Sequence, residues 1–559
     1  MKPTQRILWF FLATILVCAL LGPIYGPRVE ATTDGASGDG PVTQSLDAFS
    51  KVYGLVQQDY ADPVNPDRAI FGPENIGNLG AIPGMLRTLD PHSNFFDQRT
   101  FARLRENQEG RYFGVGMRIL TVPGEMGKWV TTVVQPMPGS PAFRAGIRPG
   151  DTILKVDAKP TLGLDGDTVA KMLKGPRGTI VKVTVTREGY DKPLDFAVTR
   201  EEISGLSVDD YFLIRPGVAY IHISSFTENT NDELSQALNK LGGKSLKGLV
   251  LDMRGNPGGL LQAAVDVSDH FLQKNQLIVY HYGRHSPEKR YYAEHGDSGE
   301  GFPMVVLVDH STASAAEIVT GALQDHDRAL VMGETSFGKG LVQTVYPLSE
   351  GTGLALTTAH YYTPSGRLIQ RDYQDVSLYD YLYTHQAATN GPREVRMTDG
   401  GRTVYGGGGI TPDVKVEEPT FNAVQTRLMV SGTCPGPDLT QCGAFFDFGK
   451  YYLGLHKTIP RDFAPDDEAV KSFVDFLAKK GLKLSDKDVE ANQDFMKSHI
   501  RDVLVDMIYG VDAAQHLSVE NDLEVQKAIE ALPQAAALLT NAKKYMASHP
   551  ESKPPEPVQ

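Results

Sequence analysis

Two short segments of this chain carry side chains that could together cleave an acyl bond. Ser314 stands among small residues just after the apolar segment Met304–Val308, and further along the chain Lys339 lies between two glycines. A serine at a strand-to-helix turn can expose its hydroxyl beside the unpaired backbone N–H groups of the helix's first turn. A lysine between glycines can approach such a hydroxyl closely. The two segments therefore indicate a nucleophile, a base and an oxyanion site.

The lysine can act as a base only when its amine is neutral. Burial away from water disfavours the ammonium form and so lowers the pKa of a lysine. Neutral Lys339 would take the proton of the Ser314 hydroxyl, and the ammonium formed could protonate the leaving amine. Gly338 and Gly340 would let the backbone place the lysine inside a packed site.

Each of these residues also has a simpler interpretation. A serine before a helix is commonly an N-cap, and Ser311 could fill that role. Taken alone, Lys339 could be a solvated loop charge, and Gln343 a polar strand residue. A histidine-based triad also stays open, because the chain has 14 histidines, although none lies in Leu251–Gly259, Thr312–Glu317 or Gly333–Gly340 and His92 lies only in the outlying segment Asp90–Ser93.

The elements that would position these side chains alternate in type from residue 203 to about residue 417. Apolar runs predict strands over Val218–Ile223, Gly248–Asp252, Met304–Val308 and Ala329–Met332. Helical patterns fall between them, over Thr230–Leu241, Leu260–Leu272 and Ala315–Asp325. This alternation is typical of an α/β core in which helices flank a largely buried sheet. Residues 373–400 are polar and irregular, which favours an insertion or a loop.

A small β-rich domain is predicted over residues 110–200. Strand patterns recur over Trp129–Gln135, Thr152–Val156 and Thr179–Arg187. Short helices are predicted between them, over Ala142–Ile147 and Asp167–Leu173.

The first 31 residues have the features of an export signal. A basic start precedes the apolar run Ile7–Leu21, and Val29-Glu30-Ala31 offers a small-residue cleavage site. The alternative is an uncleaved signal anchor in the inner membrane, although the run is short for a membrane span. Either way, the bulk of the chain would be exported. Residues 32–44 look like a linker, and residues 45–109 like a helical region that Ser45 could cap.

Composition narrows the function classes. The formal net charge of −13 argues against a nucleic-acid binder, and no P-loop is present for ATP-driven unfolding.

In an exported protein, Cys434 and Cys442 are expected to form a local disulfide, with two free thiols as the alternative. Two cysteines without nearby histidines fall short of a zinc set, so we expect no metal and no cofactor.

The last part of the chain is mainly helical. Residues 418–548 form a predicted helical extension with two apolar stripes, one made by Val470, Phe473, Val474 and Leu477, the other by Ile500, Val503, Leu504, Met507 and Ile508. Such stripes indicate a core or an interface. Residues 549–559 are rich in proline and are predicted to be a disordered tail.

Three segments together resemble the carboxy-terminal processing peptidases, or tail-specific proteases, of serine peptidase family S41. The segments are Leu251–Gly259, Thr312–Glu317 and Gly333–Gly340, and their order and spacing match the family. Two more, Asp90–Ser93 and Gly408–Asp413, resemble its flanking signatures. The resemblance implies an α/β catalytic core of crotonase/Clp-like βα layers over residues 203–417, with a PDZ domain inserted over residues 110–200.

The resemblance also implies roles for single residues. Ser314 and Lys339 would form a catalytic dyad, which Gln343 would support by accepting a hydrogen bond from the lysine. We expect three charged residues to hold the site together through ion pairs or caps rather than to react: Asp252, Arg254 and Glu317.

An oxyanion hole needs two donors. The backbone N–H of Ala315, directly after the nucleophile, is one candidate. The resemblance points to Gly259 as the second, and Gly258 is the alternative. Glycines bring their N–H groups close to a substrate without side-chain clash.

The β-rich segment resembles a PDZ domain. The resemblance implies that Gly114-Val115-Gly116 is a carboxylate-binding loop, whose N–H groups would face the terminal carboxylate of a substrate. The following strand would pair with the peptide, and Val115, Met117 and Ile119 would offer apolar surface to its last side chains. The alternative is that these apolar side chains fill the domain's own core.

These features predict an exported, ATP-independent serine endopeptidase that recognises apolar C-terminal tails and cleaves nearby. The expected partners are proteins or peptides with free apolar C-termini and no nucleic acid, while a homodimer and an inner-membrane anchor are candidates. The expected location is the periplasm or another extracytoplasmic space. Two rival functions stay open: a non-catalytic PDZ scaffold built on a decayed protease core, and an esterase that uses the same dyad.

Overall fold

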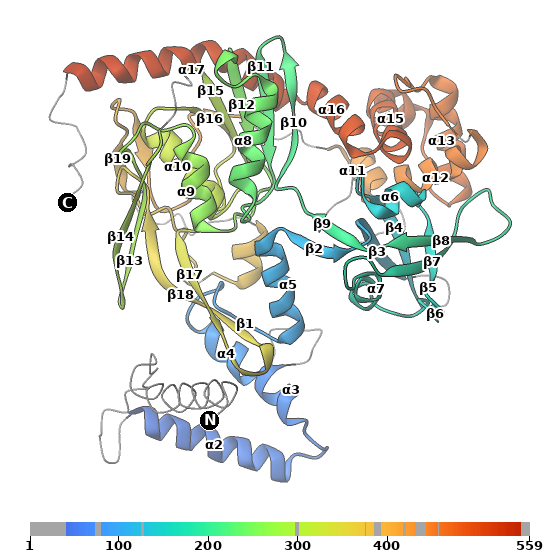
Figure 1. Ribbon diagram of the computed structural model, residues 1–559, viewed down its shortest axis with the longest axis horizontal. Helices are drawn as coiled ribbons and strands as arrows, with labels where there is room; N and C mark the ends of the chain where they lie inside the picture. Colours follow the sequence, from blue (N-terminus) through green and yellow to red (C-terminus); the bar gives the residue numbers. More distant parts are fainter. Residues whose placement is uncertain are drawn as a thin grey trace, which may run out of the picture. The chain divides into compact units, whose positions relative to one another are not determined.

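The computed structural model describes residues 41–72, 80–123, 128–296, 301–374, 376–384, 393–416, 421–430, 443–456 and 458–548. The predicted export signal, Cys434, Cys442 and the C-terminal tail lie outside these residues, so their predictions stay open. The chain divides into two compact units, Met1–Gly84 and Met85–Gln559 (Figure 1).

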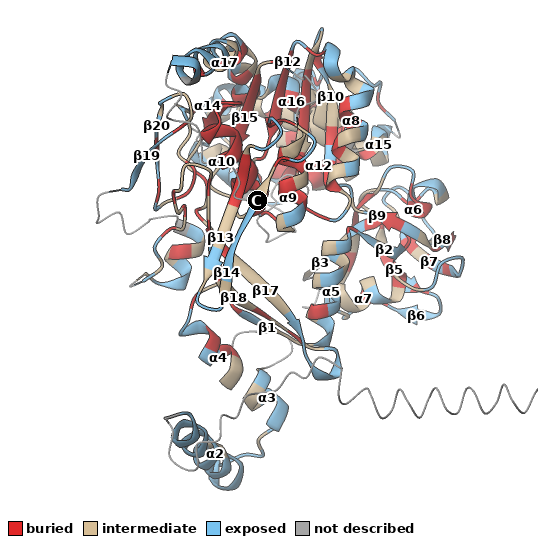
Figure 2. Cartoon of the chain, turned by 60° about the vertical axis from the view of Figure 1, so that its left-hand side comes forward, coloured by how far each residue is buried: buried red, intermediate tan, exposed pale blue. Residues whose placement is uncertain are grey.

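The first unit includes the helices α2 (Pro41–Asp59) and α3 (Pro66–Phe71). Helix α2 begins at Pro41, ahead of the expected cap Ser45, because proline is well tolerated in the first turn of a helix. Most of α2 is exposed (Figure 2), including its apolar residues Leu46, Phe49 and Val52. Within the described ranges, no helix combines the length and the apolar character that a membrane span requires.

A six-stranded sheet in the order β10-β11-β12-β15-β16-β21 forms the central layer of the second unit. Its parallel strands are β11 (Val218–Ile223), β12 (Gly248–Asp252), β15 (Met304–Val308), β16 (Leu330–Gly333) and β21 (Val414–Lys415), and β10 (Val208–Arg215) pairs antiparallel with β11. Strands β12 and β15 are buried along their whole length (Figure 2). Parallel strands covered on both faces are apolar throughout, which is why their bounds could be predicted. The predicted α/β core is confirmed.

Helices cover both faces of this sheet (Figure 1). On one face, α8 (Thr230–Leu241), α9 (Leu261–Asp269) and α10 (Ala315–Asp325) pack with Leu249 and Leu251 of β12. On the other face, α17 (Leu523–Ser548) packs with Val250 of the same strand. Successive strand residues point to opposite faces, so one strand serves both layers. The last helix of the C-terminal extension is therefore part of the core.

A second sheet has the strand order β1-β18-β13-β14, with β17 paired to β18. The strands are β1 (Asn94–Phe96), β13 (Leu277–Gly283), β14 (Ser286–Tyr292), β17 (Leu341–Pro347) and β18 (Gly353–Tyr362). Strand β17 continues directly from the segment that carries Lys339. Helices α4 (Ala81–Arg87) and α5 (Gln98–Glu109) flank β1 in the sequence.

The expectation of irregular structure over residues 373–400 is wrong in part. A π-helical turn, η4, spans Asp380–Thr384, and β19 (Val395–Met397) pairs with β20 (Thr403–Tyr405). The turn is held because Tyr381 is buried, with an exposed fraction of 2%. A single buried aromatic residue in a polar segment gives little periodic signal.

The predicted β-rich domain is confirmed as a PDZ-type sheet of β3 (Met117–Pro123), β4 (Trp129–Pro136), β5 (Thr152–Val156), β6 (Lys159–Pro160), β7 (Ile180–Thr186) and β8 (Leu194–Thr199). Helices α6 (Pro141–Ala145) and α7 (Gly166–Leu173) complete it. Where the chain enters and leaves the domain, β2 (Arg111–Gly114) and β9 (Glu201–Ser204) pair antiparallel.

The remaining helices of the C-terminal extension have their own core. They are α11 (Ala423–Val430), α12 (Ala444–His456), α13 (Asp467–Lys479), α14 (Asp486–Ala491), α15 (Gln493–Tyr509) and α16 (Val511–Asn521). Phe473 of α13 and Leu504 of α15 are fully buried in this core. Both predicted apolar stripes are thus confirmed as packing faces.

Candidate active site

One cavity of about 920 Å³ brings together the residues that were predicted to do chemistry. Its lining includes Ser314, Lys339, Gln343, Gly259 and Ala315. These residues come from β12, α10 and β17 or from the turns beside them, so the fold gathers them from positions far apart in the sequence.

Ser314 occupies an unusual backbone conformation at the turn before α10. Its φ is +55° and its ψ is −114°, in a region that a residue with a side chain rarely adopts. A Cβ added at Gly258 would lie 2.7 Å from Cβ of Ser314 and 2.8 Å from the backbone nitrogen of Ala315. The glycine turn after β12 therefore lies directly against the serine, and only a glycine fits there.

Lys339 extends into the same cavity and binds Gln343. Its Nζ donates a hydrogen bond of 3.0 Å to Oε1 of Gln343. Burial lowers the pKa of Lys339, while the negative charges of Glu317 and Asp90 oppose that effect. Within the described part of the chain, no hydrogen bond joins Nζ of Lys339 to the hydroxyl of Ser314.

A buried carboxylate fixes the two segments relative to each other. Oε2 of Glu317 accepts from the backbone N–H of Ser314 at 2.8 Å and from that of Lys339 at 2.9 Å. Oε1 accepts from the N–H of Gly338 at 2.7 Å and from the Ser336 hydroxyl at 2.5 Å. Burial raises the pKa of Glu317, and these donated bonds oppose the rise. The expected structural role of Glu317 is confirmed.

Tyr361, at the end of β18, adds a second connection that the sequence analysis missed. Its hydroxyl lies 3.0 Å from the carbonyl oxygen of Ser314 and 2.5 Å from that of Lys339. The side chain is 1% exposed. No local pattern marks this residue, because its partners are brought to it by strand pairing.

His92 and Tyr381 lie behind Gln343. The side-chain Nε2 of Gln343 donates to the backbone carbonyl of His92, and the ring Nε2 of His92 lies 2.9 Å from the hydroxyl of Tyr381. Burial, aided by the positive charge of Lys339, lowers the pKa of His92 to about 4. At neutral pH the imidazole is therefore uncharged. The flanking signature that contains His92 signalled this position, whereas nothing in the sequence signalled Tyr381.

The two predicted oxyanion donors differ from their neighbours in hydrogen bonding. The N–H of Gly258 donates to Oδ1 of Asn256 at 2.8 Å and is already used. Within the described residues, the backbone N–H groups of Gly259 and Ala315 have no acceptor. Both residues line the cavity that Ser314 also lines. The geometry thus favours Gly259 over Gly258.

The predicted PDZ loop combines available donors with buried side chains. In the described structure, the N–H groups of Val115 and Gly116 have no acceptor, as a carboxylate-binding loop requires. The Val115 and Met117 side chains are 3% and 8% exposed and belong to the domain's own core, while Ile119 packs beside them half-buried. For these side chains, burial favours the alternative that they fill the core.

The chain is similar in sequence to known protein families and proteins. The profile of peptidase family S41 matches residues 217–376, and that of the PDZ domain matches residues 132–187. A carboxy-terminal-processing protease of Bartonella bacilliformis is 36% identical over 365 residues, which cover 65% of this chain and 79% of that protein. The carboxy-terminal processing protease CtpB of Bacillus subtilis is 32% identical over 348 residues, which cover 62% of this chain and 70% of that protein.

Proposed function

Because this chain belongs to the carboxy-terminal-processing proteases of peptidase family S41, we propose that it is an endopeptidase that uses a Ser314–Lys339 dyad. The observation that carries the proposal is a half-buried amine of lowered pKa that shares a cavity with a serine in a strained turn. A neutral amine in that position is a suitable general base.

In the proposed acylation step, neutral Nζ of Lys339 takes the hydroxyl proton as Oγ of Ser314 attacks the substrate carbonyl carbon. The carbonyl oxygen becomes an oxyanion that accepts from the N–H groups of Gly259 and Ala315. When the intermediate collapses, the C–N bond breaks and the Lys339 ammonium gives its proton to the leaving amine. Water then attacks the acyl carbon while neutral Lys339 takes its proton, and the lysine returns that proton to Oγ of Ser314 as the acyl C–O bond breaks and the carboxylic product leaves.

Gln343 and Glu317 would position the base in this mechanism. The Gln343 side chain holds Nζ of Lys339 by accepting from it, and Glu317 holds the lysine backbone. For proton transfer, a side-chain rotation must bring Nζ to Oγ of Ser314. Catalytic hydrogen bonds of this kind commonly tighten only when substrate is bound.

Substrate selection is proposed to take place at the PDZ domain. The available N–H groups of Val115 and Gly116 could bind a terminal carboxylate, and the edge of β3 could pair with an extended tail. A tail with apolar residues would gain by burying them. The proposed substrates are therefore unfolded proteins with free apolar C-termini.

Export and dimerisation are further parts of the proposal. The basic and apolar pattern of residues 1–31 supports delivery to the periplasm or another extracytoplasmic space, with or without a retained inner-membrane anchor. The exposed apolar residues of α2 support a homodimer. N-terminal sequencing of the exported protein tests whether the chain is cleaved after Ala31. Analytical ultracentrifugation of the Phe49→Glu variant, compared with the parent chain, tests whether α2 is a dimer interface.

The test of the activity uses an unfolded protein that ends in three apolar residues, and a copy that ends in three aspartates. We expect the parent chain to degrade the apolar-tailed protein faster than the aspartate-tailed copy. In Ser314→Ala and in Lys339→Ala, the rate of degradation should fall by at least about 1000-fold. Equal degradation by the parent chain and Ser314→Ala would contradict the proposal and favour a scaffold. Hydrolysis of small esters without dependence on the tail would favour an esterase.

A further inference from the structure

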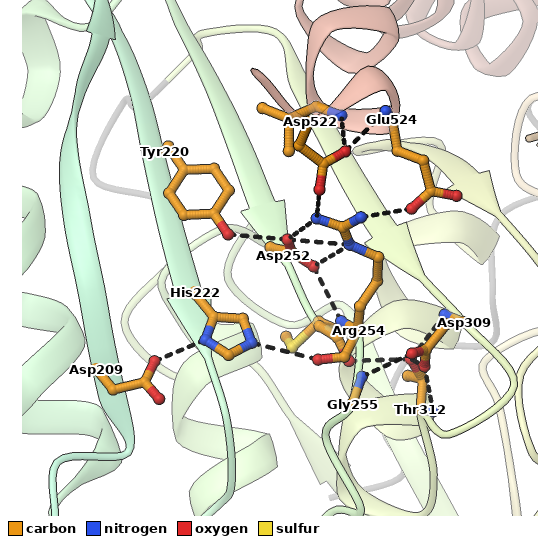
Figure 3. Close-up of polar contacts among 12 residues, drawn as sticks. Asp209, Tyr220, His222, Asp252, Arg254, Gly255, Asp309, Thr312, Asp522 and Glu524 are labelled. Atoms are coloured by element: carbon orange, nitrogen blue, oxygen red, sulfur yellow. Dashed lines mark hydrogen bonds and ion pairs between the residues drawn. The ribbon is translucent and has the colours of Figure 1, made fainter. Parts of the chain in front are cut away.

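The loop that carries Gly259 starts at an ion-pair cluster. Arg254 lies two residues after Asp252, the last residue of β12, and the loop continues through Gly255 to Gly259. Figure 3 shows the Arg254 guanidinium surrounded by carboxylates from two parts of the chain that are far apart in sequence.

One carboxylate of the cluster is local and two are distant. Nη2 of Arg254 lies 2.6 Å from Oδ2 of Asp252, which is buried. The same nitrogen lies 2.9 Å from Oδ2 of Asp522, and Nη1 lies 2.5 Å from Oε2 of Glu524. Asp522 and Glu524 stand at the junction of α16 and α17, so they belong to the C-terminal extension.

The arginine is held on its backbone side as well. Nε2 of His222 lies 3.2 Å from the carbonyl oxygen of Arg254, and Nδ1 lies 2.6 Å from Oδ1 of Asp209 (Figure 3). Because both ring nitrogens face acceptors, the imidazole is doubly protonated. The next residue, Gly255, donates its N–H to Oδ2 of Asp309 at 2.9 Å.

Further along, the loop is tied to the serine turn. The N–H of Ala313 donates to the carbonyl oxygen of Asn256 at 2.9 Å, and Nδ2 of Asn256 donates to Ile223 at 2.7 Å. A displacement of Arg254 would therefore be transmitted to residues 255–258, the turn that joins Arg254 to Gly259. The closeness of Gly258 to Ser314 leaves little space to absorb such a displacement.

We propose that Asp522 and Glu524 are positioning residues for the oxyanion donor of Gly259, and that they act through Arg254. The inference rests on the proposed protease function. The Arg254 side chain is 20% exposed, and Asp252 alone cannot accept from all five of its N–H donors. Without the two distant carboxylates, the guanidinium would turn toward water and move the start of the loop. The C-terminal extension is thus a part of the catalytic apparatus.

The test compares the double variant Asp522→Asn, Glu524→Gln with the parent chain on an internally quenched peptide that ends in Leu-Ala-Val. Both substitutions keep the side-chain shape, and asparagine remains a competent N-cap for α17. We expect kcat to fall about 10-fold with KM within about twofold, because an oxyanion donor acts mainly in the transition state. Affinity for a peptide boronic acid, whose adduct places an oxygen in the oxyanion site, should fall in parallel.

The controls separate this inference from the proposed function. Glu530→Gln changes an exposed carboxylate on the same helix and should leave kcat unchanged. The exchange Asp522→Glu, Glu524→Asp retains both charges and should restore most of kcat. If the double variant is unfolded, Asp522→Asn alone is measured, and its kcat should be about threefold lower than that of the parent chain.

Parent-like kcat in the folded double variant would overturn the inference. So would a loss of activity that only follows the folded fraction, with unchanged boronate affinity per folded molecule. A parent chain that hydrolyses the peptide no faster than Ser314→Ala would instead contradict the proposed function itself.

Discussion

Lys339 is half-buried, and its Nζ donates a hydrogen bond to Oε1 of Gln343. Burial disfavours the ammonium form, so the proposed base is neutral at a lower pH than an ordinary lysine. The charges of Glu317 and Asp90 limit this effect. The balance between burial and charge at this one residue decides the pH at which the proposed enzyme works.

The pH dependence of kcat should reveal that balance. Since only the neutral amine accepts a proton, kcat should rise with pH through the pKa of Lys339 and reach a plateau below the ordinary lysine value of 10.5. Stopped-assay turnover between pH 5 and pH 10 measures it. A profile without a rising limb would contradict a lysine base.

Glu317 is the second decisive side chain, because four donors converge on it. Glu317→Gln would turn an amide NH₂ toward these donors and leave some unsatisfied. We expect a loss of about 3 kcal/mol or more in the free energy of unfolding and a large loss of kcat. Urea unfolding beside the exposed control Glu490→Gln measures the stability effect. Parent-like stability and turnover would show that the carboxylate is dispensable.

Among the elements, the strands of the core could be predicted most closely from the sequence. Strands β11, β12 and β15 have the predicted bounds because they are short, apolar and covered on both faces. The β17–β18 hairpin could not be predicted in the same way, because pairing with β1 and β13 depends on distant segments. Tyr361 enters the site through that pairing, so its position was also unpredictable.

Within the site, too, some features could be predicted from the sequence and others could not. The segments of Ser314, Lys339 and Gly259 could be found from local residue types and a family resemblance, and the structure brings them into one cavity. The contacts of Arg254 with Asp522 and Glu524 join positions separated by most of the catalytic core and the extension. No local pattern can predict such a contact.

Helix α17 should contribute strongly to stability, since it covers one face of the central sheet. Leu532 is 7% exposed, and a Cβ added at Gly248 of β12 would lie 2.8 Å from its Cδ1. We expect Leu532→Ala to cost about 2–5 kcal/mol in urea unfolding, against little change for the exposed Lys527→Ala. Equal effects of the two substitutions would mean that α17 does not pack on the sheet in solution.

Across the second unit, the C-terminal extension contacts both the catalytic core and the PDZ domain. Nε2 of Gln135 in β4 donates to Oδ1 of Asp506 in α15 at 2.7 Å. A Cβ added at Gly150 would lie 2.7 Å from Cγ of Lys450 in α12. The extension therefore links the proposed tail-binding domain to the core that carries Ser314.

Asp506 makes this link sensitive to pH. Burial raises its pKa from 3.8 to about 6, with Arg118 opposing the rise. The unfolded chain therefore ionises first as pH increases, and the folded state loses stability between pH 3.8 and about 6.

Asp506→Asn keeps the acceptor for Gln135 and removes this cost. We expect the variant to be more stable at pH 8 by at most about 3 kcal/mol, and by about half as much at pH 5. Urea midpoints at both pH values measure the difference, and equal midpoints at pH 8 would contradict the buried carboxylate.

The activation of Ser314 by Lys339 can be measured without any substrate preference. A fluorophosphonate probe forms an Oγ–P bond with an activated serine and releases fluoride, and the labelling rate reports how readily the hydroxyl loses its proton. At pH 8 we expect rapid labelling of the parent chain, none of Ser314→Ala, and a rate at least about 100-fold lower for folded Lys339→Met. Labelling of Lys339→Met at the parent rate would contradict this expectation.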